Sequence, residues 1–161
     1  MTRFRHPLTA RLAVPLLALL ALAGCATTAG AGSTPTPTAS SSGPCTGVTV
    51  VVDFGTFKKA PIHACAVAGP ATDVLTAAHI ATAGSADYGD QAICRVDDLP
   101  SPADESCAKL PSDAYWALWV RDSSAAKWEY AQVGVTALQL TAGQSLGLVY
   151  THGSDSTPPA G

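Results

Sequence analysis

The chain has 161 residues, with nine Lys or Arg, twelve Asp or Glu and a formal net charge of −3. All twelve acidic residues lie beyond position 25, but three of the nine basic residues precede it, so the later part carries six basic against twelve acidic residues, a formal charge of −6. A surface of this charge repels phosphate backbones, and we therefore expect no nucleic-acid partner.

The first 24 residues have the order of a signal peptide. Three arginines precede an apolar run over residues 12–23, which at about 1.5 Å per residue is too short to cross a hydrocarbon layer of about 30 Å. The sequence Leu22-Ala23-Gly24-Cys25 follows and resembles the lipobox of bacterial lipoproteins. The resemblance implies cleavage before Cys25 and acylation of its thiol, which would hold the chain on the extracytoplasmic face of the cell membrane. The alternative is a secreted protein in which Cys25 has no special role.

Composition divides the rest of the chain into three parts. Residues 25–44 after the signal peptide are almost entirely Thr, Ala, Gly, Ser and Pro, which cannot bury a core, so we predict a disordered tether. Residues 153–161 have a similar composition, and we predict a disordered tail. Residues 45–152 between them have the usual length of one domain.

The domain opens with two predicted strands. Residues 48–54 are rich in β-branched side chains, and Gly55 ends this first strand. A second strand is predicted over residues 62–68, closed by Gly69-Pro70.

One helix and four further strands are predicted after these. Thr72 or Asp73 can cap the helix, and Gly84 ends it. The apolar face of the helix consists of Val74, Leu75, Ala78 and Ala81. Short strands are expected over residues 93–96, 115–121, 128–132 and 146–150. This order predicts an α+β fold, a small sheet with one helix packed across it.

Four cysteines remain once Cys25 is assigned to lipid attachment. An even number in an exported domain predicts two disulfides. Of the three pairings we favour Cys45 with Cys65 and Cys94 with Cys107, because each joins neighbouring elements and neither bridge threads through the other. The paired ligands of a zinc site, such as Cys-x-x-Cys, do not occur in the sequence, so we expect no metal.

Aromatic residues recur through the last third of the domain. The runs are Tyr115-Trp116-Ala117-Leu118-Trp119, Lys127-Trp128-Glu129-Tyr130, Gly134 and Ala142-Gly143-Gln144 to Tyr150. Together with residues 48–54 they resemble the C-terminal domain of the cobalamin carrier transcobalamin, which belongs to the soluble-ligand-binding β-grasp family. The resemblance covers nearly all of residues 45–150. It implies a β-grasp fold and a small-molecule ligand of a cobalamin-like kind.

A binding site follows from strand alternation. Alternation places Tyr115 and Trp119 on one face of their strand and Trp116 on the other. Because one helix cannot bury both faces, we predict a partly exposed aromatic surface formed by Tyr115 and Trp119 with Trp128 and Tyr130 of the next strand. The alternative is that all seven Trp and Tyr side chains fill the core.

Motifs of metal- or nucleotide-dependent catalysis do not occur in the sequence. It contains no His-Glu-x-x-His, no phosphate loop and no dinucleotide fingerprint. The acidic pairs Asp97-Asp98 and Asp104-Glu105 lack the alternating oxygen ligands of a calcium loop, so we predict a solvated acidic loop there. We expect no enzyme activity and no cofactor.

The sequence therefore predicts a lipid-anchored, non-catalytic binding or accessory domain. Its partner would be a small molecule or a protein of the cell envelope. The alternative is a structural or inhibitor-like domain for protein–protein interaction. A concave pocket lined by the predicted aromatic residues favours the first, and a flat patch or an open sheet edge favours the second.

Overall fold

The computed structural model describes residues 44–153 and 156–160. The predicted signal peptide, Cys25 and nearly all of the predicted tether lie outside these residues. Across the part that is described, no helix has the length and apolar character needed to cross a membrane.

The described residues form a mixed α+β domain, which confirms the predicted class. Its elements are β1 (Val48–Asp53), the 3₁₀ turn η1 (Gly55–Phe57), β2 (Ile62–Ala66), β3 (Gly69–Pro70), α1 (Ala71–Ala77), β4 (Thr82–Ser85), β5 (Gly89–Val96), β6 (Ala114–Arg121), β7 (Glu129–Tyr130), β8 (Gln139–Leu140) and β9 (Ser145–His152). The short strands β3, β4 and β8 were not predicted from the sequence.

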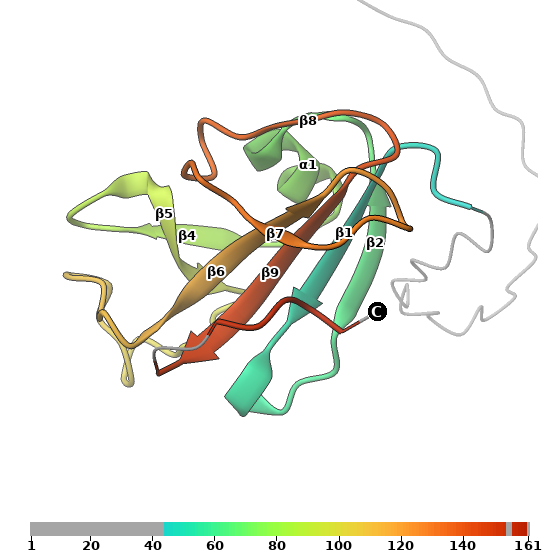
Figure 1. Ribbon diagram of the computed structural model, residues 1–161. Helices are drawn as coiled ribbons and strands as arrows, with labels where there is room; N and C mark the ends of the chain where they lie inside the picture. The colour runs from blue at the N-terminus through green and yellow to red at the C-terminus, as the bar shows by residue number, and fades with distance from the viewer. Residues whose placement is uncertain (1–43, 154–155, 161) are drawn as a thin grey trace, which may run out of the picture. The chain divides into compact units, whose positions relative to one another are not determined.

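The main sheet has five strands in the order β2-β1-β9-β6-β7 (Figure 1). β1 and β9 lie parallel at its centre, and the other neighbours are antiparallel. β3 pairs with β8 and β4 pairs with β5 in two smaller sheets. Because the central pair joins the first and last strands, the hydrophobic core forms only when both ends of the domain come together.

One face of the main sheet forms the core with α1. Alternate side chains of the central strands point into it: Val48, Val50, Val52, Trp116, Leu146 and Leu148. The helix contributes Val74 and Leu75, which are also buried. The indole N–H of Trp116 has a hydrogen-bond partner within this core, because it donates to the Leu99 carbonyl at 3.1 Å. Val48, Val50 and Val52 of β1 thus face the core, and Val51, which points to the other face, is buried as well.

The opposite face of β9 is covered by the C-terminal segment. Residues 145–151 are all buried, because α1 lies on one side and residues 156–160 cross the other (Figure 1). Pro159 is buried, and a Cβ added to Gly147 would lie 2.7 Å from the proline Cγ. This segment belongs to the predicted disordered tail over residues 153–161, whose mostly polar composition gives no indication of the contact that Pro159 makes.

The helix α1 is shorter than predicted. It has seven residues and no side-chain cap, so Thr72 and Asp73 lie inside its first turn instead of capping it. His79 has a φ of 57°, which takes the chain out of the helical conformation. Gly84 belongs to β4, which pairs with β5. The small residues of this stretch suit helix and strand alike, and pairing with β5 decides between them.

Both predicted disulfide pairs are confirmed. Cys45 and Cys65 are bonded with their Cα atoms 5.6 Å apart, and Cys94 and Cys107 with theirs 5.9 Å apart. The first bridge ties the residues before β1 to β2. The second ties β5 to the loop that precedes β6, and both of its cysteines are buried.

Candidate functional site

A cavity of about 390 Å³ opens at the edge of the main sheet. β5 provides one wall through residues 91–93, and residues 110–112 close one end. The remaining walls are three side chains of β6 and residues 130–134. Residues 91–93 and residues 130–134, which are far apart in the sequence, thus both face β6.

The path of the chain after β7 creates this cavity. Ala131 N–H donates to the Leu118 carbonyl of β6 at 2.9 Å. The chain then leaves β6 and crosses to β5, where Val135 N–H donates to the Gln91 carbonyl at 3.2 Å. Gly134 passes so close to β5 that an added Cβ would lie 2.6 Å from the Gln91 oxygen. The space left between β6 and residues 131–134 is the cavity.

Two of the four predicted ligand-binding side chains, Tyr115 and Tyr130, line the cavity. Tyr115 belongs to β6 and Tyr130 to β7. Tyr130 remains 43% exposed, and Tyr115 is close enough to it to affect its pKa. The pair therefore forms an accessible aromatic wall that carries two hydroxyl groups.

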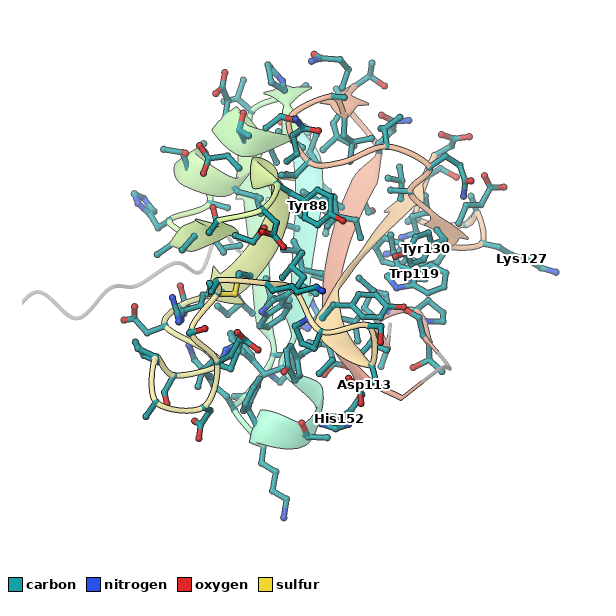
Figure 2. The ribbon with its side chains drawn as sticks, turned by 90° about the vertical axis from the view of Figure 1, so that its left-hand side faces the viewer. Tyr88, Asp113, Trp119, Lys127, Tyr130 and His152 are labelled. Atoms are coloured by element: carbon teal, nitrogen blue, oxygen red, sulfur yellow. A yellow bond between two sulfur atoms is a disulfide. The ribbon has the colours of Figure 1, made fainter. Side chains whose placement is uncertain are left out.

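The other two predicted residues, Trp119 and Trp128, lie outside the lining. Trp119 packs edge-to-face on Tyr130 with ring centroids 5.4 Å apart, and Figure 2 shows the two side by side, with Lys127 extending away from them. The Arg121 guanidinium lies over the Trp128 ring, 4.5 Å from its centroid. The indole Nε1 atoms of both tryptophans are buried without a hydrogen-bond partner among the described residues. Trp119 supports the tyrosine wall from outside the cavity.

Several lining residues were not predicted. They are Gln91, Ala92, Ile93, Leu110, Pro111, Ser112, Trp116, Leu118, Ala131, Gln132, Val133 and Gly134. Most of them lie in turn-rich segments or irregular strand ends, where no periodic pattern marks a binding wall. Trp116 was assigned to the other face of β6, and that assignment is correct. The Trp116 side chain reaches the cavity because the cavity lies beside the edge of β6 and not above one face of the sheet.

The described residues that line the cavity carry no charged side chain. Its polar groups are the amides of Gln91 and Gln132, the Ser112 hydroxyl and the two tyrosine hydroxyls. Burial raises the pKa of Tyr130 above its ordinary value of 10.0, and the neighbouring Tyr115 hydroxyl adds to the effect. The walls therefore stay neutral at physiological pH.

The raised pKa of Tyr130 predicts a specific alkaline behaviour. The folded protein retains a proton that the unfolded chain loses near pH 10, so the free energy of unfolding falls as pH rises from 10 through the folded pKa. Tyr130→Phe should remove a late step from the tyrosinate absorbance titration and reduce this fall in stability. Tyr88→Phe, at an exposed position outside the lining, is the control. If the late step of the absorbance titration were unchanged in Tyr130→Phe, the assignment of a raised pKa to Tyr130 would be wrong.

The acidic pairs have local structural roles. Asp97 forms an ion pair with Lys59, at 3.0 Å, and also accepts a hydrogen bond from the Ala81 N–H. Glu105 accepts from the Cys107 N–H at 2.8 Å. Among the described residues, no group of three or more His, Cys, Asp or Glu side chains is placed to hold a metal ion.

Two other hollows of similar size differ in their lining. One of about 380 Å³ is bordered by small residues and Val67 near the start of β1. The other, of about 360 Å³, contains Asp104, Glu105 and Asp113; burial first, and then these carboxylates, raise the pKa of Tyr150 there. The first has no aromatic wall, and the second includes Phe57 and Tyr150 but is also lined by the three carboxylates.

No protein-family model, curated protein or solved structure matches this chain. The kind of ligand that the cavity could bind is therefore inferred from the side chains that line it. Aromatic rings, amides and hydroxyls can stack on a ligand and exchange hydrogen bonds with it.

Proposed function

We propose that the chain is an extracytoplasmic lipoprotein, anchored by lipid on Cys25, whose domain over residues 45–152 binds a small uncharged ligand without transforming it. The observation that carries the proposal is the cavity of about 390 Å³ walled by Tyr115 and Tyr130. Ligand sites commonly have volumes of about 300–1,000 Å³ and mostly apolar linings with a few polar groups. The lining has this character.

The strand order supports membership of the β-grasp class. The first and last strands lie parallel at the centre of the sheet, β2 flanks β1, and β6 with β7 flanks β9. The helix α1 follows β2 in the chain and packs on the sheet through the core. This arrangement accords with the resemblance to soluble-ligand-binding β-grasp domains, and a cobalamin-like molecule is one ligand to test.

The lipid anchor is tested on Cys25. In the full chain expressed in a bacterial host, the N-terminal peptide should begin at Cys25 and carry the mass of a diacylglycerol group. Cys25→Ser should abolish this modification and move the protein out of the detergent phase in Triton X-114 partition. Ser40→Ala, in the same segment, is the control. An unmodified Cys25 in the wild-type chain would overturn the proposed anchor.

Ligand binding is tested by thermal shift of the full chain in detergent. The compounds are cobalamins, sugars, uncharged aromatic amides and short peptides. A ligand at 100 times its dissociation constant stabilises the folded state by about 2.7 kcal/mol. Tyr115→Ala should abolish the shift, and Tyr88→Ala, at an exposed position outside the lining, should retain it. A shift that survives Tyr115→Ala would place the ligand elsewhere.

A further inference from the structure

We propose that the cavity takes an extended, uncharged peptide segment that adds as a strand to the free edge of β6, opposite Trp116. This inference rests on the proposed function, because it concerns the same cavity, and it names the chemical class of the ligand.

The edge of β6 offers main-chain groups without a partner strand. In an antiparallel ladder, alternate residues direct N–H and C=O to opposite neighbours. The Leu118 carbonyl accepts from Ala131 on the side away from β9, so Trp116, two residues earlier, directs its N–H and C=O to that side. β7 pairs with β6 at Trp119 and Val120. Within the described residues no strand meets Trp116 there, and such an edge is a template for an added strand.

The cavity lies where β7 would continue along β6. In the register of β7, Ala131 stands opposite Leu118, and Val133 would stand opposite Trp116. Instead, residues 131–134 cross to β5 and Val133 lines the far side of the cavity. The vacated stretch from Ala114 to Ala117 covers about 10 Å between its first and last residues at about 3.3 Å per residue, enough for a segment of about four residues.

The walls fit the two faces of a strand. Alternate side chains of an extended peptide point in opposite directions. On one side they would meet Tyr115 and Tyr130, and on the other the apolar groups of Ile93 and Leu118. Main-chain hydrogen bonds would then provide affinity, and the two walls would select the side chains.

The charge of the lining favours the uncharged interior of a peptide over a charged end. The described lining holds amides and hydroxyls and no charged side chain, so a buried terminal carboxylate or ammonium would find no opposite charge to offset its loss of hydration. Gln91 and Gln132 can instead donate to and accept from amide groups.

The test uses the full chain, labelled with ¹⁵N in detergent, and the capped peptide acetyl-Ala-Val-Tyr-Val-Ala-amide. Binding should move the Trp116 backbone amide resonance downfield and slow its hydrogen exchange. A second peptide, N-methylated at the amides that would face β6, should bind at least tenfold more weakly. Equal binding of the two peptides would overturn strand addition.

Matched variants locate the contact. Val133→Asp places a charge at the cavity wall and should weaken binding of the capped peptide at least tenfold. Val67→Asp places the same charge at a more exposed position, outside the lining, and should leave binding unchanged. The thermal midpoint of each variant shows whether it is folded.

The outcomes separate the two proposals. If a cobalamin, sugar or aromatic amide binds and shifts the resonances of Tyr115 and Tyr130, while no peptide does, the inference of a peptide ligand is wrong and the proposed function stands. If nothing perturbs any cavity residue, both fail.

Discussion

Replacing the four bridged cysteines with alanine should lower the free energy of unfolding by about 6 kcal/mol. The bridges join residues 20 and 13 positions apart, and loops of this length are worth about 3 kcal/mol each in terms of chain entropy. The loops do not overlap in sequence, so their effects should add approximately. Because a domain of this size is stable by about 5–15 kcal/mol, the quadruple variant should retain at most about 9 kcal/mol and unfold at a clearly lower urea concentration.

Urea unfolding of the wild type, of each alanine pair and of the quadruple variant measures the effect. The wild type under reducing conditions serves as the control, because it loses the same bonds without a change of side chain. A quadruple variant whose unfolding midpoint equals that of the oxidised wild type would contradict the prediction.

The bridge between Cys94 and Cys107 also concerns the site. It ties β5, which forms one cavity wall, to the loop that continues into the lining residues 110–112. The Cys107 carbonyl further accepts from the Ala86 N–H at 2.8 Å, which joins this loop to the β4–β5 turn. Stability and the shape of the cavity therefore depend on the same bond.

The central strands could be predicted because their signals are strong and local. Five of the seven residues 48–54 are β-branched, and β6 is rich in aromatic and aliphatic side chains. The disulfide pairs followed from an even number of cysteines and short separations. The strands β3 and β8 have two residues each, and such short pairings depend on tertiary contacts that no local pattern reveals.

The site was predicted in part, for a related reason. Alternation placed Tyr115 and Trp119 on one face of β6 correctly, and Tyr130 lies beside Trp119 through the register of β7. Which of these side chains faces a cavity depends on where residues 131–134 leave the sheet. That path is fixed by contacts with β5, about forty residues earlier in the chain, so the sequence of β6 and β7 alone could not indicate it.

Trp116→Ala should lower the free energy of unfolding by about 3–5 kcal/mol, the range for truncating a buried large aromatic side chain. Trp116 is 4% exposed and packs edge-to-face on Phe54 and Tyr150, with ring centroids 5.6 and 5.3 Å away. Its removal leaves a void and takes the indole donor away from the Leu99 carbonyl, so lost packing and a lost hydrogen bond act together.

Trp119→Ala is the matched comparison, three residues further along the same strand and on the opposite face. Trp119 is half-buried and contacts Tyr130 through its ring, so its truncation should cost about 1–2 kcal/mol, near the centre of the range for single substitutions. It should also weaken ligand binding, because Tyr130 loses its support. Urea unfolding followed by circular dichroism avoids the change in tryptophan fluorescence. Equal losses in the two variants would show that the aromatic residues form one continuous core and would remove the distinction between core and binding wall.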